Sequence, residues 1–219
     1  MLEAVLFDMD GVLADSEPVH AAALGDVLRA HGLDAVTDED YERFFLGKTD
    51  RTGLGDYLRA RVARAPDLEA LLREKAAAFA HRFPREVRLF PDGVATLRAL
   101  ADRGYRIAIA SGGLTAEIAM VVDLAALGPY VAVRVTGDEV PDGKPNPAPY
   151  LLAAERLGVK PDRCVVVEDA PAGVAAAKAA GMRCLAVDRT GQPEQLAAAD
   201  RVVEQLTPQA VEALGNEDR

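Results

Sequence analysis

The sequence has no tryptophan, only two cysteines and few aromatic residues, which make up 5% of its 219 residues. Without aromatic platforms, binding that relies on stacking against bases or sugar rings is disfavoured. Two cysteines with no C-x-x-C pair give no disulfide framework, as suits a reducing cytoplasm. Basic residues are also in the minority, because 25 Lys and Arg face 35 Asp and Glu, giving a formal net charge of −10. We therefore expect no nucleic-acid partner.

The sequence also lacks long apolar runs. None approaches the roughly 18 residues of a membrane-spanning helix, and no basic stretch precedes the first apolar segment as it would in a signal peptide. We expect a cytoplasmic protein with no membrane partner. The length and the 50% hydrophobic content allow one compact domain, or a core domain with a smaller insert. The acidic surface and the small insert are compatible with a monomer, which we expect.

Short apolar segments alternate with helical patterns over most of the chain. The segments are rich in Val, Ile and Leu without polar alternation, which is typical of strands covered on both faces. Strands that alternate with helices predict an α/β fold, a doubly wound parallel sheet with a Rossmann-like core. The predicted strands are Ala4–Phe7, Arg106–Ala110, Val131–Thr136, Cys164–Val167, Arg183–Val187 and Arg201–Val203. The predicted helices between them are Gly93–Arg103, Thr115–Leu127, Pro147–Leu157 and Pro171–Ala180.

The stretch from Ser16 to Val87 breaks this alternation because it contains no good strand. A connection of this length inside a domain is uncommon unless it is itself folded. We therefore predict a helical domain of residues 16–87, inserted into an α/β core domain of residues 1–15 and 88–219. Its predicted helices are Pro18–His31, Asp38–Phe45, Thr52–Arg64 and Leu68–Phe83.

Polar residues follow several predicted strands at their carboxyl ends, where open parallel sheets bind their ligands. A lysine in the loop before a predicted helix is able to reach the same edge. We expect all of these side chains to surround one cleft. They are Asp8, Asp10, Ser111, Lys144, Glu168 and Asp169.

The chemistry of this set favours phosphoryl transfer. Crowded carboxylates repel one another unless a cation or protons intervene, and oxygen donors with no His or Cys nearby favour magnesium over zinc. Ser111 and the glycines after it offer a hydroxyl and N–H groups to an anion, and Lys144 offers a positive charge. Asp8 could then attack phosphorus, while Asp10 protonates a leaving oxygen and later deprotonates water.

Each residue alone also has an ordinary structural explanation. Asp8 could be a turn residue, Ser111 could cap the next helix, and Lys144 could be a solvated surface charge. Glu168 and Asp169 could be acids favoured by the dipole of the helix that follows them. The coincidence of all of them at one sheet edge favours the site.

Four motifs in this order resemble the haloacid dehalogenase-like hydrolase superfamily. They are Phe7-Asp-Met-Asp-Gly-Val-Leu, Ser111 after an apolar strand, Gly143-Lys-Pro, and Val165-Val-Val-Glu-Asp-Ala-Pro-Ala-Gly-Val. The insert is similar in position to the helical cap of the branch that contains phosphatases and β-phosphoglucomutases, so the resemblance implies that residues 16–87 are a cap domain. Ala170 departs from the family, which often has a serine after the Glu-Asp pair.

The resemblance implies a role for each matched residue. Asp8 is then the nucleophile, Asp10 the general acid and base, and Ser111, Gly112 and Lys144 the phosphate-binding residues. Mg²⁺ is the implied cofactor, and its implied ligands are Asp8, the Asp10 carbonyl and Asp169, with Glu168 in or beside the first shell.

We therefore predict a magnesium-dependent phosphatase that hydrolyses a small phosphorylated metabolite through an aspartyl-phosphate, with sugar phosphates among the candidates. One alternative is a β-phosphoglucomutase-like phosphomutase. Those enzymes carry Lys-Gly-x-x-Arg in the cap loop, and the Arg holds a second phosphate. Aligned on Gly47, this chain has Asp50 there, which argues against a mutase, although Lys48 and Arg51 leave a shifted clamp open.

His20, Lys48 and Arg51 are the candidate substrate residues of the cap. The resemblance implies that His20 senses cap closure, whereas an ordinary helix-surface histidine and solvated Lys and Arg charges are the other interpretation. A phospho-acceptor switch and a non-catalytic binding module are further alternatives. The insert, the length and the D-x-D pair argue against the switch, and the complete set of required side chains argues against the binding module.

Overall fold

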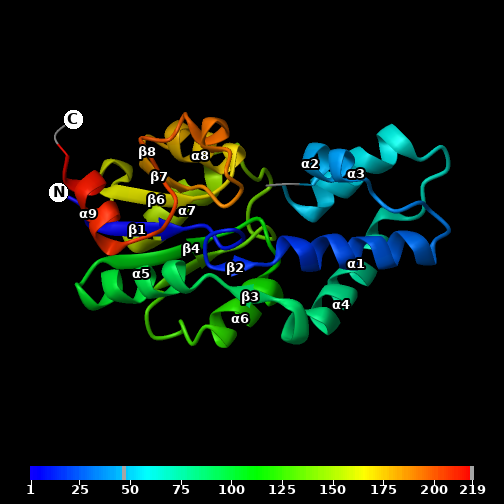
Figure 1. Cartoon of the computed structure of the whole chain (residues 1–219), viewed down its shortest axis with the longest axis horizontal. Helices are drawn as coiled ribbons and strands as arrows, with labels where there is room; N and C mark the ends of the chain where they lie inside the picture. The colour runs from blue at the N-terminus through cyan, green and yellow to red at the C-terminus, as the bar shows by residue number, and fades with distance from the viewer. Residues whose placement is uncertain (46–47, 218–219) are drawn as a thin grey trace. The chain divides into compact units, whose positions relative to one another are not determined.

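The computed structural model describes residues 1–45 and 48–217 and separates into two compact units. The α/β unit consists of Met1–Ala14 and Leu89–Arg219, and the helical unit of Asp15–Arg88. Two short strands, β2 (Ala14–Asp15) and β3 (Arg88–Leu89), lie where the chain passes between the units, and they form a two-stranded sheet (Figure 1).

The α/β unit is built on a six-stranded parallel sheet in the order β5-β4-β1-β6-β7-β8, which confirms the predicted fold class. From β1 the chain builds one half of the sheet through β4 and β5, and then the other half through β6, β7 and β8. The switch point of this topology, where such sheets bind ligands, lies beside β1. The strands are β1 (Ala4–Phe7), β4 (Arg106–Ala110), β5 (Val133–Val135), β6 (Cys164–Glu168), β7 (Arg183–Val187) and β8 (Arg201–Val203).

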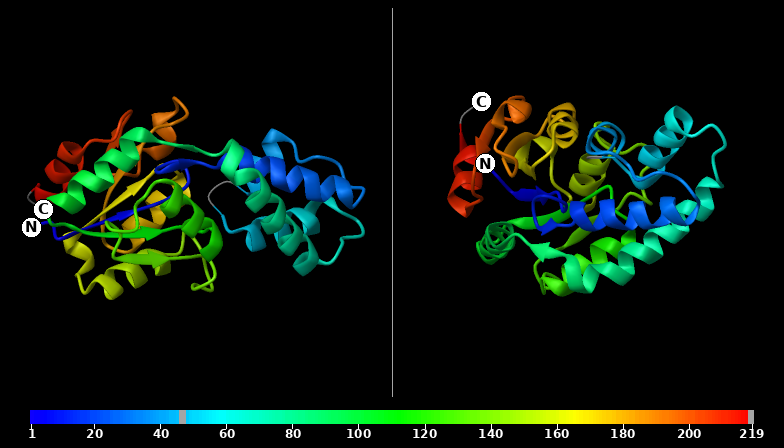
Figure 2. Two further views of the ribbon diagram at one scale, coloured as in Figure 1. Left: turned by 90° about the horizontal axis from the view of Figure 1, so that it is seen from below. Right: turned by 45° about the vertical axis from the view of Figure 1, so that its right-hand side comes forward.

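Helices cover both faces of this sheet, which explains why its strands are apolar throughout (Figures 1 and 2). Helices α7 and α8 pack on one face, and α5 and α9 on the other. The helices are α5 (Pro91–Asp102), α6 (Thr115–Leu124), α7 (Ala148–Leu157), α8 (Pro171–Ala179) and α9 (Pro208–Asn216), with short 3₁₀ turns at Pro161–Arg163 and Pro193–Leu196.

The helical unit contains α1 (Glu17–Ala30), α2 (Asp38–Phe44), α3 (Asp50–Arg61) and α4 (Leu68–Glu86). Helix α1 packs along α4, and α2 packs on α3. An apolar core of its own joins the four helices, with Leu24, Leu28, Leu54 and Leu71 among its buried residues. Within the described part of the chain, no helix combines the length and the hydropathy needed to cross a membrane.

Several element ends differ from the sequence expectations. Helix α3 begins at Asp50 rather than Thr52, because the Thr49 hydroxyl caps it by accepting the N–H of Thr52. Helix α4 continues past Phe83 to Glu86 although Pro84 lies in its last turn. The pairing of β2 with β3 and the whole of α9 were not predicted, since a two-residue strand has no pattern of its own and α9 is short.

Candidate active site

Three neighbouring strands bring the predicted acidic and hydroxyl side chains together. In the sheet, Phe7 of β1 lies opposite Ile109 of β4 and Val167 of β6, so the residues that follow these strands lie at one edge. Asp8 comes directly after β1, and its N–H donates to the carbonyl of Val167 at 2.9 Å. The parallel register therefore brings Asp8, Ser111 and Glu168 to the same end of the sheet.

Lys144 lies buried between two of these carboxylates. Its Nζ is 2.6 Å from Asp8 Oδ1 and 2.7 Å from Glu168 Oε1, and only 7% of its side chain is exposed. Burial opposes its charge, but the facing carboxylates of Asp8 and Glu168 outweigh burial and raise the pKa of Lys144 above its ordinary value. This lysine is therefore held as a cation beside Asp8.

Asp8 carries an unfavourable charge in this environment. Burial raises the pKa of its carboxyl to about 8, and the neighbouring charges of Glu168 and Asp10 add to this effect, although Lys144 opposes it. One lysine thus faces more negative charge than it can balance. A bound cation would relieve the repulsion among these carboxylates.

Glu168 is fully buried and hydrogen-bonded through both oxygens. Its Oε1 accepts from Lys144 and, at 2.5 Å, from the hydroxyl of Tyr150, while its Oε2 accepts the N–H groups of Asp169 and Ala170 at 3.0 and 3.1 Å. These four bonds hold the carboxylate behind Asp8 and orient the lysine. Sequence reasoning missed Tyr150, which looks like an ordinary apolar residue on the buried face of α7.

Gly173 of α8 leaves the space that Glu168 occupies. A Cβ at position 173 would lie 1.6 Å from Glu168 Oε1, so the helix and the carboxylate approach each other more closely than any side chain allows. We expect Gly173→Ala to lower the free energy of unfolding by more than about 2 kcal/mol, although alanine is normally the better helix former by about 1 kcal/mol.

Gly55 of α3 is the matched control for this prediction. It is also a helical glycine, but a Cβ there would meet only ordinary contacts, with the nearest atom at 3.5 Å. Gly55→Ala should therefore keep or raise the stability measured by urea unfolding. Equal effects of the two substitutions would contradict the proposed packing of Gly173 against Glu168.

Ser111 connects the loop after β4 to the D-x-D segment. Its hydroxyl donates to Asp10 Oδ2 at 3.2 Å and accepts the N–H of Gly113 at 3.0 Å. Gly112 is held from the other side, because a Cβ at Gly137 would lie only 2.3 Å from the Gly112 carbonyl oxygen. The predicted phosphate-binding residues Ser111 and Gly112 thus lie in a tightly packed loop beside Asp10.

Three acidic side chains could hold a metal ion at this edge. Asp8, Glu168 and Asp169 each offer an oxygen within 4.8 Å of the other two. Gly11 shows how closely Asp169 approaches the D-x-D loop, because a Cβ on Gly11 would lie 1.7 Å from Asp169 Oδ2. This all-oxygen donor set fits a hard divalent cation such as Mg²⁺. Both oxygens of Glu168 already accept hydrogen bonds, from Lys144, Tyr150 and two backbone N–H groups.

The helical unit contains a buried lysine that the sequence analysis missed. Lys75 of α4 is 2% exposed, and its Nζ lies 2.5 Å from Asp50 Oδ2 and 2.5 Å from Nδ1 of His20. The His20 ring stacks on Phe79 with the ring centroids 4.2 Å apart. Because Lys75 has no acceptor, Nδ1 must accept, which places the proton of a neutral His20 on Nε2.

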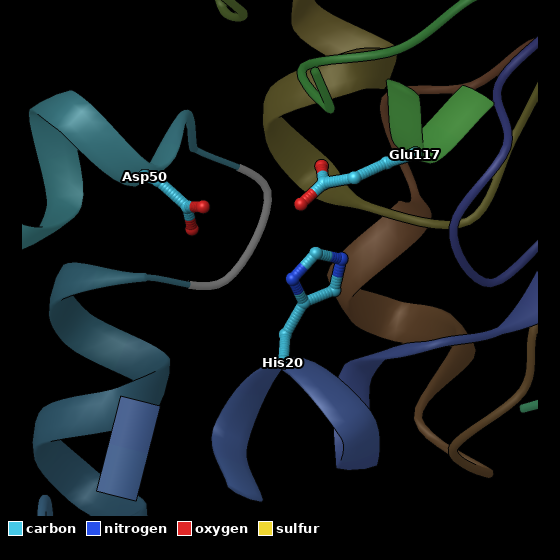
Figure 3. Close-up of side chains that lie close together, drawn as sticks. All are labelled: His20, Asp50 and Glu117. Carbon is cyan, nitrogen blue, oxygen red and sulfur yellow. The ribbon is translucent and has the colours of Figure 1, made fainter. Parts of the chain in front are cut away.

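Figure 3 draws His20 on α1 and Asp50 at the start of α3, two residues that lie 30 positions apart in the sequence. The same figure labels Glu117 in the first turn of α6 in the α/β unit. Glu117 is buried, and its Oε2 accepts the N–H of Leu114 at 2.8 Å, which caps α6 directly after the Ser111 loop.

The other two candidate substrate residues of the insert lie in surface interactions. Arg51 forms a paired contact with Glu69, and 62% of its side chain is exposed. Lys48 donates to the Arg43 carbonyl at 3.0 Å. Gly47, on which the cap loop was aligned, lies outside the described residues. Of the three predicted residues, His20 is the one in contact with Lys75.

The family comparison agrees with the motifs at this edge of the sheet. The profile of the haloacid dehalogenase-like hydrolases matches residues 2–181 of the chain. The chain belongs to this family. Its six-stranded parallel sheet places the four motifs of this hydrolase at one edge.

Relatives of this hydrolase include proteins named as phosphatases of phosphorylated carbohydrates and of hexitols. It is 34% identical over 181 residues to a phosphorylated carbohydrates phosphatase of Thermotoga maritima, covering 83% of this chain and 82% of that protein. It is also 34% identical to hexitol phosphatase A of Escherichia coli K12, over 92% and 90% of the two chains. Among solved structures, CbbY from Rhodobacter sphaeroides in complex with phosphate matches with a TM-score of 0.88 and 28% identity, covering 98% of this chain and 99% of that one.

Proposed function

We propose that this hydrolase is a magnesium-dependent phosphatase for a small phosphorylated metabolite of the sugar or sugar-alcohol type, and that Asp8 accepts the phosphoryl group. The observation that carries the proposal is the buried contact of 2.6 Å between Lys144 Nζ and Asp8 Oδ1. It favours the charged form of Asp8 against the effect of burial, and it orients the carboxylate at the switch point of the sheet. The names of the two phosphatase relatives support the substrate class.

Two carboxylates divide the chemistry between them. An Asp8 oxygen forms a bond to phosphorus while the bond from phosphorus to the substrate oxygen breaks, and Asp10 gives its proton to that oxygen. Water then attacks the phosphorus and Asp10 takes a proton from it, so phosphate leaves and Asp8 is regenerated. Ser111, the N–H groups of its loop and Lys144 bind the phosphoryl oxygens through both steps.

Mg²⁺ is the ion that this site would bind. Asp8 and Asp169 would supply carboxylate ligands, and the Asp10 carbonyl and Glu168 are the further candidates. When bound, the ion neutralises charge on the phosphoryl group and on the acidic cluster.

The helical unit acts as the cap that selects the substrate and excludes water. The pairing of three of its cations favours hydrolysis over a phosphomutase reaction, which needs a clamp for a second phosphate. Lys75 is paired with Asp50, Arg51 with Glu69, and Lys48 with a backbone carbonyl. A second phosphate that binds one of these three cations would have to displace its partner.

The test is a screen of phosphate esters with purified protein, Mg²⁺ and a chelator. We expect phosphate release from sugar or sugar-alcohol phosphates in Mg²⁺, loss of at least about 100-fold with EDTA, and recovery when Mg²⁺ is added back. Undiminished release in EDTA would contradict the metal assignment.

A second assay separates phosphatase from mutase. β-Glucose 1-phosphate is supplied with a trace of the bisphosphate, and both phosphate and glucose 6-phosphate are measured. Conversion to glucose 6-phosphate without phosphate release would contradict hydrolysis. The expectation of a monomer stays a prediction, which sedimentation of the purified chain tests.

A further inference from the structure

Arg189 connects the turn after β7 to the turn after β1 and to the first turn of α5, at the edge of the sheet that carries the candidate site. It follows β7, and its guanidinium makes a paired contact with Asp92, with Nη1 and Nη2 at 3.0 and 2.9 Å from the two carboxylate oxygens. Its Nε donates to the carbonyl of Gly11 at 3.0 Å. The Arg189 and Asp92 side chains are only 18% and 12% exposed, so water weakens these contacts little.

The Gly11 carbonyl belongs to the turn that carries Asp10. Gly11 has φ of +74°, and its N–H donates to the Ala14 carbonyl at 2.9 Å. On one side this turn packs against Asp169, and on another against α5, where a Cβ at Gly93 would lie 2.0 Å from the Val12 carbonyl oxygen. Arg189 holds the turn through the carbonyl of Gly11. A shift of Gly11 moves the adjacent Asp10.

Other hydrogen bonds hold both Asp92 and the turn that carries Arg189 in place. Asp92 lies in the first turn of α5 and also accepts the N–H of Leu206 at 2.9 Å. Before Arg189, the carboxylate of Asp188 accepts the N–H groups of Thr190 and Gly191 at 2.9 and 2.8 Å, which holds the turn after β7. The guanidinium also lies over the Phe90 ring, 4.1 Å from its centroid. The guanidinium group of Arg189 is therefore already oriented to donate to the carbonyl of Gly11.

We propose that Arg189, anchored by Asp92, is a positioning residue that holds the Asp10–Gly11 backbone in the geometry the reaction needs. This inference rests on the proposed function for its catalytic consequence, but the contact to Gly11 stands without it. Arg189 touches no reacting atom. It acts through the carbonyl of Gly11. The planar guanidinium group is needed because it donates to the Asp92 carboxylate and to the Gly11 carbonyl at the same time.

The test compares Arg189→Met, Arg189→Lys and the control Arg106→Met. Arg106 also donates to a backbone carbonyl, that of Leu157, but it lies at the start of β4, the opposite edge of the sheet. We expect Arg189→Met to lower kcat by about 10- to 100-fold with KM changed less than about threefold. Lysine should restore part of kcat because it keeps the charge without the fork. Arg106→Met should leave both constants near those of the wild type.

Amide hydrogen exchange of the peptide that covers residues 9–14 provides a readout independent of activity. Its exchange should be faster in folded Arg189→Met than in the wild type, and unchanged in Arg106→Met. Equal exchange of this peptide in all three proteins, or a kcat no lower than that of the control, would overturn the inference. If the wild type releases no phosphate from any ester, the proposed function is wrong, and the exchange rates alone decide the positioning claim.

Discussion

Asp8→Asn is expected to lower kcat by at least about 10⁴-fold, since loss of a nucleophile leaves only binding and electrostatic effects. An amide cannot form the bond to phosphorus that the carboxylate forms. The fold should persist, because the substitution removes one of the two carboxylates that share Lys144 and keeps the shape of the side chain. Steady-state phosphate release and urea unfolding measure the two effects separately.

Asp123→Asn is the matched control for this prediction. Asp123 is exposed on α6, and the substitution makes the same chemical change away from the cluster. It should leave kcat within about twofold of the wild type, as expected for surface substitutions. Phosphatase activity retained in folded Asp8→Asn would remove Asp8 from the role of nucleophile.

Lys144→Met is expected to have the largest effect on stability. Breaking a buried ion pair from one side costs about 3–5 kcal/mol, because the charge left behind has lost its partner. Here the substitution leaves two buried carboxylates, Asp8 and Glu168, without their cation. We expect loss of activity together with a marked fall in the free energy of unfolding, measured in urea.

Two comparisons make the result for Lys144 specific. The double variant Lys144→Met/Glu168→Gln should recover part of the lost stability, because it removes one unpaired carboxylate. Lys178→Met breaks an ion pair with Asp200 whose lysine is 40% exposed, and it should cost less than about 1 kcal/mol. A Lys144→Met protein as stable as Lys178→Met would contradict the buried pairing, and the activity loss would then reflect phosphate binding alone.

The candidate site could be anticipated from sequence where it depends on strand ends. Asp8, Ser111 and Glu168 follow three apolar strands directly, and parallel strands bring their carboxyl ends to one edge. That argument requires only the order of residues along the chain. It could not predict that Lys144 is buried, since its loop has no pattern that fixes its depth.

Contacts between distant segments were not predicted, because no local pattern in the sequence identifies the partner. The sequence does indicate that Lys75 is buried, since it belongs to the buried stripe of α4 that repeats every four residues, Leu71, Lys75, Phe79 and Phe83. A lysine on such a stripe needs a partner, but nothing local identifies Asp50, 25 residues earlier. Tyr150 and Arg189 left no signal, because their partners Glu168 and Gly11 depend on tertiary packing.

The most direct test of the central claim is to trap phosphate on Asp8. Asp10→Asn protein is mixed with p-nitrophenyl phosphate and Mg²⁺, and the reaction is quenched in acid. The protein is then digested, and the mass of the peptide that contains Asp8 is measured by mass spectrometry. This ester needs little protonation of its leaving group, so the first step proceeds, whereas the second is slow without Asp10 to deprotonate water.

We predict that the Asp8 peptide gains the mass of one phosphoryl group, and that the double variant Asp8→Asn/Asp10→Asn gains none. Release of p-nitrophenol with no phosphorylated peptide at any time, or with the phosphoryl group on a different residue, would contradict the account.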